Sequence, residues 1–212
     1  MLNYELTPNH AGLVLWGDYP TLERLHELVH KVVVESSAIE DKEGFILGLA
    51  YDVRKAFQGA RSESHMDHGG GRCTIFGVEI LWPVILVQVG ILRHAMAFMP
   101  TNRLDQATMF ELEHLVESAV CAAMPGTTDE VIHHMSQIGA IACHHIDTVF
   151  DSRCRYFIEL PANKRLVALP KLMETFYPMY GFLAEQGATM RSGFILPEAF
   201  VIGDYEWPDF EW

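Results

Sequence analysis

A polar, glycine-rich segment at residues 59–72 holds the side chains most suited to chemistry. It carries Glu63, His65, Asp67 and His68, and three glycines follow directly. Imidazole nitrogens and carboxylate oxygens are ligands that zinc, iron and manganese take in proteins, and glycine lets the backbone approach a ligand closely. These four residues are therefore the candidate metal ligands, in an expected loop. The competing interpretation is a solvated loop whose histidines are incidental.

The chain has 11 histidines, so the question of metal binding extends beyond this segment. Three Glu-x-x-His pairs occur, a spacing that di-iron bundles use to aim ligands inward: Glu23/His26, Glu111/His114 and Glu130/His133. Helical periodicity turns His114 away from the apolar side of its expected helix, which disfavours a di-iron core. The adjacent pairs His133-His134 and His144-His145 are expected to lie in a polar seam between helices, with their hydrogen bonds satisfied.

The end of the chain, residues 204–212, is acidic and aromatic. Its four large rings belong to Tyr205, Trp207, Phe210 and Trp212. Rings of this size are costly to leave in water. They are expected to dock on this chain, on a second copy of it or in a basic groove of another protein. They are the candidate partner-binding residues.

Composition and charge exclude several classes of partner. The net charge is −13 and no basic cluster offsets it, so the surface repels nucleic acid and anionic lipid. The four cysteines include no Cys-x-x-Cys pair, which is typical of reduced thiols in the cytoplasm. The first residues lack the features of a secretory signal. The apolar run at residues 80–92 is shorter than the roughly 20 residues of a membrane span. We therefore expect a soluble cytoplasmic protein that binds neither nucleic acid nor membrane.

The expected elements follow from hydrophobic periodicity. The run at residues 80–92 is apolar on every side, and a helix of this kind must be wrapped by neighbours. It predicts a central buried helix at about 78–99. Short antiparallel strands are expected at the N-terminus and as a hairpin at about 154–169. A further helix is expected to start within residues 18–21 and to continue along the apolar stripe from Leu22 to Val33. Others are expected at residues 44–58, 104–124, 129–150 and 171–186.

Together these patterns predict an α+β fold that is mainly α: a helical bundle around the central helix, with a small antiparallel β-sheet. Residues 1–203 are expected to form a single globular α-rich domain and residues 204–212 a C-terminal tail.

Two functional hypotheses remain open. No complete catalytic set is recognisable, so the leading hypothesis is a non-enzymatic interaction protein of an inhibitory or regulatory kind. It would bind a protein partner with a basic surface, or its own copy in a homo-oligomer such as a homodimer, and would need no cofactor. The alternative is a metal-dependent enzyme, a hydrolase or oxygenase. It would hold zinc, iron or manganese on Glu63, His65, Asp67 and His68, with help from helix histidines.

Overall fold

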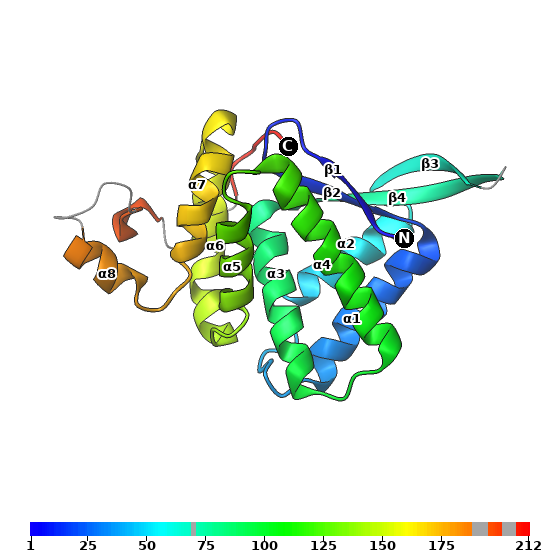
Figure 1. Ribbon diagram of the computed structural model, residues 1–212, viewed down its shortest axis with the longest axis horizontal. Coiled ribbons are helices and arrows are strands. Elements are labelled where there is room, and N and C mark those ends of the chain that lie inside the picture. Colours follow the sequence, from blue (N-terminus) through cyan, green and yellow to red (C-terminus); the bar gives the residue numbers. More distant parts are fainter. Residues whose placement is uncertain (69–70, 188–194, 201–206) are drawn as a thin grey trace.

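The computed structural model describes residues 1–68, 71–187, 195–200 and 207–212. Within these residues there are eight α-helices and one four-stranded antiparallel sheet (Figure 1). The predicted class, an α+β fold that is mainly helical, is confirmed. No helix in this part of the chain combines the length and the apolar composition that a membrane crossing requires.

The sheet has the strand order β1-β2-β4-β3, with every neighbouring pair antiparallel. Its strands are β1 (Asn3–Leu6), β2 (Gly12–Gly17), β3 (Ser62–His68) and β4 (Gly71–Leu81). The two N-terminal strands lie where the sequence predicts them. The expected loop at 59–72 is wrong: β3 and β4 form a hairpin that extends away from the helices (Figure 1). Residues 62–67 are exposed on both faces, so the hairpin lacks the apolar alternation that identifies a half-buried strand.

The sheet has one buried face that turns toward the helices. Leu13 lies opposite Ile80 and Leu15 opposite Val78, and all four side chains are buried. On the other face Trp16 lies opposite Gly77. A Cβ atom at residue 77 would come within 2.6 Å of the Trp16 ring, so this position needs glycine.

The helices follow in chain order, with clear start signals at two of them. Asp18 caps the first, and Asn102 forms a capping box with Asp105 at the fourth. The α-helices are α1 (Tyr19–Glu35), α2 (Leu47–Phe57), α3 (Trp82–Ala95), α4 (Arg103–Ala123), α5 (Thr128–Ile138), α6 (Cys143–Glu159), α7 (Ala162–Glu174) and α8 (Tyr180–Gly187). Two short 3-10 helices are η1 (Met96–Phe98) and η2 (Pro197–Ala199).

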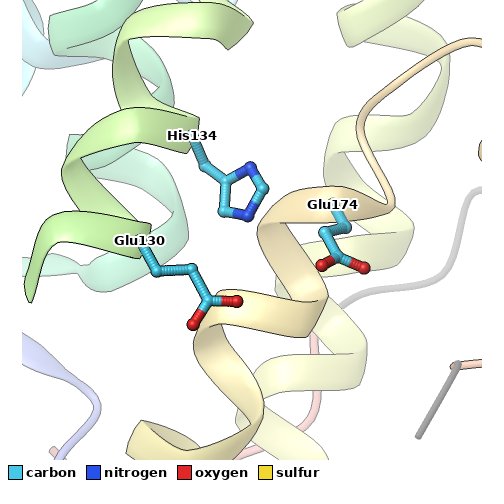
Figure 2. A group of neighbouring side chains, drawn as sticks. All are labelled: Glu130, His134 and Glu174. Carbon is cyan, nitrogen blue, oxygen red and sulfur yellow. The ribbon is translucent and has the colours of Figure 1, made fainter. Parts of the chain in front are cut away.

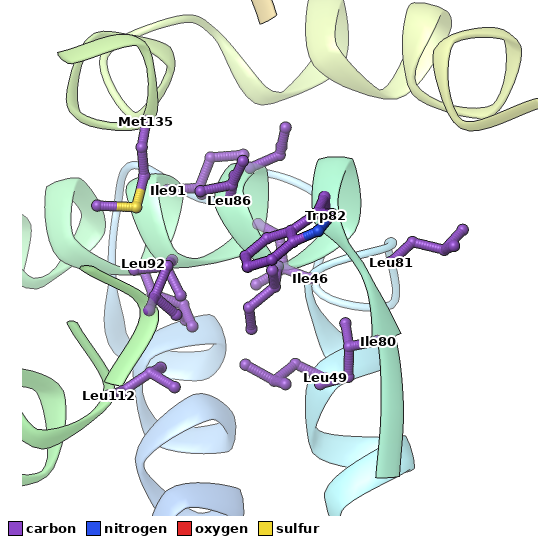
Figure 3. Packing of buried hydrophobic residues seen from close by; sticks show 14 of the residues in the cluster. Ile46, Leu49, Ile80, Leu81, Trp82, Leu86, Ile91, Leu92, Leu112 and Met135 are labelled. Carbon is purple, nitrogen blue, oxygen red and sulfur yellow. The ribbon is translucent and has the colours of Figure 1, made fainter. Parts of the chain in front are cut away.

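Helix α3 is the centre of the hydrophobic core. Leu86, Ile91 and Leu92 are almost completely buried although they point in different directions. Figure 3 shows these side chains enclosed by Leu49 of α2, Leu112 of α4 and Met135 of α5, among others. The predicted central buried helix is confirmed, but it is shorter than 78–99. The first residues of that span are the end of β4, and the last belong to η1 and the turn after it.

The predicted hairpin at 154–169 is wrong, because these residues lie in α6 and α7. The run of Tyr156, Phe157 and Ile158 is rich in aromatic and β-branched residues, which favour strands. The buried positions Phe150, Cys154 and Phe157 instead follow the helical period of three and four residues. The expected helix at 129–150 is two helices, α5 and α6. The expected last helix at 171–186 is α7, which starts earlier, followed by α8.

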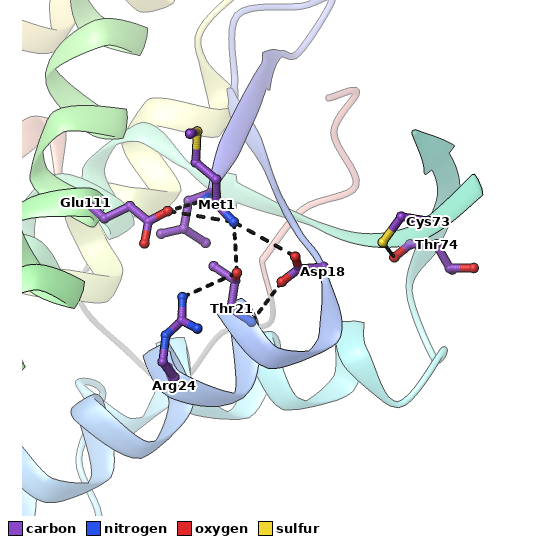
Figure 4. Close-up of polar contacts among 8 residues, drawn as sticks. Met1, Asp18, Thr21, Arg24, Cys73, Thr74 and Glu111 are labelled. Carbon is purple, nitrogen blue, oxygen red and sulfur yellow. Dashed lines mark hydrogen bonds and ion pairs between the residues drawn. The ribbon is translucent and has the colours of Figure 1, made fainter. Parts of the chain in front are cut away.

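The N-terminal residues join β1 to two helices (Figure 4). The amino group of Met1 donates a hydrogen bond of 2.9 Å to the Thr21 hydroxyl and lies 3.9 Å from the carboxylates of Asp18 and Glu111. The Leu2 amide donates to the same Glu111 carboxylate at 2.7 Å. The carboxylate of Glu111 is therefore already paired with the N-terminal residues.

The last residues, 207–212, lie against the rest of the chain. The Asn9 amide donates to the Trp212 carbonyl at 2.9 Å, and the Arg165 guanidinium donates to the Glu211 carbonyl at 2.8 Å. The rings of Phe210 and Trp212 pack against the hydrophobic core. These two rings therefore dock on their own chain.

Candidate functional site

A cleft with a volume of about 510 Å³ lies beside the C-terminal residues. Its walls come from α2, β4, α3, α6 and residues 207–212. This volume falls in the range of roughly 300–1,000 Å³ that is usual for ligand sites. Segments that lie far apart in the sequence, within residues 45–61, 78–88, 150 and 207–212, meet here, so the cleft forms only when they pack together.

One wall of the cleft is an edge of β4. The pairing of β4 with β3 ends at Gly77, but β4 continues to Leu81. The Trp82 amide donates to the Ala11 carbonyl on the β2 side. Because hydrogen-bonding direction alternates along an antiparallel strand, the backbone groups of Glu79 and Leu81 point to the opposite edge. That edge lines the cleft.

Aromatic rings make the other walls. Phe45 and Phe150 are stacked with their centroids 4.6 Å apart, and Phe210 and Trp212 are 4.9 Å apart. The Trp207 side chain also lines the cleft and is 38% exposed. Such rings offer apolar contact area and π faces that attract cations.

Gln88 of α3 supplies an unusual polar atom at the cleft. Its side-chain nitrogen donates to the Phe45 carbonyl at 2.9 Å. Its side-chain oxygen is buried and accepts no hydrogen bond from any described residue. The residue is only 2% exposed. A buried acceptor without a partner costs about 1–3 kcal/mol, so this oxygen favours a ligand that carries an N–H or O–H donor.

The charged groups at the cleft are two carboxylates and one guanidinium. Arg61 lies 3.2 Å from the Asp52 carboxylate on α2. Burial raises the pKa of Asp52, and the Arg61 charge opposes that rise. Glu79 is exposed at the rim of the cleft. Together the three groups leave one negative charge unbalanced.

A second polar group lies elsewhere, where α5 meets the end of α7 (Figure 2). Glu130, His134 and Glu174 bring one ligand atom each to within 4.8 Å of one another. They are the only such His, Cys, Asp and Glu group among the residues the structure describes. The Lys171 ammonium lies 2.6 Å from Glu174 and 3.8 Å from Glu130.

The metal ligands predicted from sequence lie on one exposed strand. Glu63, His65 and Asp67 alternate along β3, so their side chains share a face. The ring of His65 forms a hydrogen bond of 3.4 Å with Thr74 on β4. The side chain of His68 lies outside the described part. The ligand atoms of Glu63, His65 and Asp67 do not form a cluster that could share one ion. A metal role for this strand stays a prediction.

The structure describes three of the four predicted partner-binding rings. Trp207, Phe210 and Trp212 line the cleft, whereas Tyr205 lies outside the described residues. Sequence reasoning missed Gln88, Asp52 and Arg61. Gln88 could have been found, because it is the only hydrogen-bonding residue other than Trp82 in the apolar run at 80–92. Asp52 and Arg61 carry no comparable signal in the sequence.

The fold and the cleft define a mainly helical α+β protein with an aromatic ligand-sized cleft beside its C-terminal residues. A family model described as a domain of unknown function (DUF6904) matches residues 2–212, and the chain belongs to that family. No curated protein and no solved structure matches the chain.

Proposed function

We propose that this protein is a non-enzymatic binding protein that takes a basic side chain of a protein partner into the cleft. The observation that carries this proposal is the buried side-chain oxygen of Gln88, which lacks a donor among the described residues. The ammonium group of lysine and the guanidinium group of arginine are donors without acceptors. Either can satisfy that oxygen.

Three other features support the same ligand. The net charge of −13 draws a basic partner toward the protein. The rings of Trp207, Phe210 and Trp212 offer cation–π contacts. The edge of β4 at Glu79 and Leu81, which pairs with no strand among the described residues, can pair with an extended segment of the partner and add backbone hydrogen bonds to the recognition.

The proposal is tested with a capped Gly-Lys-Arg-Lys-Gly peptide, followed by the indole N–H signals of the tryptophans in NMR spectra. The expected result is saturable binding that shifts the signals of Trp207 and Trp212 and leaves that of Trp16 unchanged. A capped Gly-Glu-Glu-Glu-Gly peptide is expected not to bind. The proposal is overturned if the basic peptide does not bind, or if the shifts lie away from the cleft.

Variants separate recognition in the cleft from general attraction to an acidic surface. Gln88→Met keeps the length of the side chain and removes both polar atoms. It is expected to weaken peptide binding about tenfold or more, because hydrogen bonds to charged groups contribute about 1.5–3 kcal/mol. Asp52→Asn is expected to weaken it as well. Glu35→Gln makes the same charge change at an exposed site on α1 and should have little effect. Equal affinity in all three variants would show that only long-range charge is involved.

A further inference from the structure

The side chains of Glu130, His134 and Glu174 are arranged as a set of metal ligands. Glu130 and His134 are four residues apart on α5, so they lie on the same side of that helix. Glu174 is the last residue of α7. Figure 2 shows the three side chains converging from the two helices. Their ligand atoms lie within 4.8 Å of one another, a span that one ion can bridge once the side chains close on it.

The ring of His134 is held in the orientation that a metal ligand needs. Its Nδ1 atom forms a hydrogen bond of 2.9 Å with the Tyr177 hydroxyl. Histidine ligands are commonly oriented in this way, by a hydrogen bond from the ring nitrogen that does not bind the metal. The residue is 9% exposed, and its Nε2 atom makes no hydrogen bond to another described residue. This leaves the Nε2 lone pair for an ion when Nδ1–H donates to Tyr177.

The charges around His134 also suit a cation. Burial lowers the pKa of His134, while the Glu174 and Glu130 carboxylates oppose this effect and His133 and Lys171 add to it. The side chain of Lys171, which pairs with both carboxylates, is 47% exposed and can turn into water without leaving a buried site.

We propose that Glu130, His134 and Glu174 bind one divalent first-row transition-metal ion, which replaces the Lys171 ammonium between the two carboxylates. Three protein ligands leave a coordination position for water, unlike the closed four-ligand sites that are purely structural. The mixed nitrogen and oxygen set suits zinc, manganese or iron, and disfavours magnesium, which prefers oxygen ligands alone. This metal site is separate from the cleft, and it does not depend on the function proposed for the cleft.

The experiment is a calorimetric titration of the untagged protein with Zn²⁺, repeated with Mg²⁺. The expected result is one Zn²⁺ bound per chain, with the His134 ring signals changing in NMR spectra, and no comparable binding of Mg²⁺. Glu174→Gln keeps the side-chain shape and should weaken Zn²⁺ binding about tenfold or more. Even changes to residues that only hydrogen-bond a metal ligand weaken metal binding by about 10–100-fold. Lys171→Ala removes the competing cation and should strengthen Zn²⁺ binding.

Two further variants act as matched controls. His133→Ala removes the exposed neighbour of His134 on the same helix. His30→Ala removes one member of the His26–His30 pair, whose ring centroids lie 4.5 Å apart and which could chelate an ion at the surface. Neither should change the affinity. The proposal is overturned if the wild-type protein binds no Zn²⁺ at a single site, if Glu174→Gln binds as tightly as wild type, or if either control abolishes binding.

Discussion

The side-chain amide of Gln88 donates to the Phe45 carbonyl at 2.9 Å, while the oxygen of the same amide is buried without a partner among the described residues. One side chain thus stabilises the segment before α2 and at the same time keeps a buried acceptor, without a donor among the described residues, beside the cleft. In the proposed function, the ligand would supply the donor that this oxygen lacks among the described residues.

This relationship predicts that Gln88→Met will have little effect on stability. The change loses the hydrogen bond to Phe45, which contributes about 1 kcal/mol, and also removes a buried acceptor whose lack of a partner costs about 1–3 kcal/mol. The two effects nearly cancel, so we expect the free energy of unfolding in urea to stay within about 1 kcal/mol of wild type. Gln88→Ala leaves a cavity beside Phe45 and should be clearly less stable than Gln88→Met. A loss above about 3 kcal/mol in Gln88→Met would mean that the oxygen has a stabilising partner.

A close backbone contact between α3 and α5 gives a second prediction. A Cβ atom at Gly90 would lie 2.1 Å from the Met135 carbonyl oxygen, so Gly90→Ala forces the helices apart. Overpacking of this kind costs about 1–3 kcal/mol, and the contact here is with backbone, which cannot turn away. We expect a loss at or above the upper end of that range in urea unfolding.

Gly126→Ala is the matched control for this substitution. No atom lies within 4 Å of the place a Cβ would take at Gly126. Alanine there reduces the freedom of the unfolded chain and should stabilise the protein by about 0.4–1 kcal/mol, or leave it unchanged. A similar change in the free energy of unfolding in Gly90→Ala and Gly126→Ala would show that α3 and α5 can move apart at little cost.

The sequence predicts the class of fold well, because the all-apolar run at 80–92 has few alternatives to a central helix. It predicts the ends of elements less well. The segment at 154–169 favours strands locally, but packing of Cys154 and Phe157 against the core determines that it is helical. The hairpin of β3 and β4 could not be predicted, because neither face of its outer part is buried and its residues show no alternation of apolar and polar side chains.

The candidate sites show the same limit. The aromatic residues near the C-terminus are evident from composition, but their partners in the cleft, such as Asp52, come from distant segments. Likewise Glu130 and His134 share a helix, whereas Glu174 joins them only because α7 packs on α5. The spacing of four residues, rather than the three of Glu130/His133, brings the histidine to the inner side of α5. Long-range neighbours of this kind leave no local pattern in a single sequence.

Arg165 of α7 gives a third prediction, about the C-terminal residues. The residue is 5% exposed, and its guanidinium donates to four backbone carbonyls, those of Asn9, Ile158, Leu160 and Glu211. Arg165→Met leaves these carbonyls without their donor. Because each buried unsatisfied group costs about 1–3 kcal/mol, we expect a loss of about 3 kcal/mol or more in the free energy of unfolding.

The same variant should loosen the end of the chain before the whole protein unfolds. Trp212 is held partly through the Arg165 contacts, so its release exposes the indole and moves the fluorescence emission to longer wavelength. Arg103→Met, at an exposed position at the start of α4, is the control and should leave both stability and emission near wild type. An unchanged emission spectrum in Arg165→Met would show that the ring contacts alone hold these residues.

The fourth prediction concerns Asp105 and acid stability. Its carboxylate accepts a hydrogen bond of 2.6 Å from the Lys31 ammonium and one of 2.8 Å from the Asn102 amide. Burial alone would raise the pKa of Asp105, but the bonds from Lys31 and Asn102 hold it below the ordinary value of 3.8. A carboxyl group with a lowered pKa in the folded state stabilises the protein above the unfolded value, and this contribution disappears as the pH falls through the folded value.

Asp105→Asn should therefore be less stable than wild type at neutral pH and should lose less stability on acidification. Urea unfolding at neutral pH and at about pH 3 measures both effects, since the contribution of the carboxylate is present at the first condition and is being lost at the second. Glu117→Gln removes an exposed carboxylate from the same helix and should follow the wild-type pH dependence. If the difference between Asp105→Asn and wild type were the same at both pH values, the stabilising role of Asp105 would come from its shape at the helix start and not from its charge.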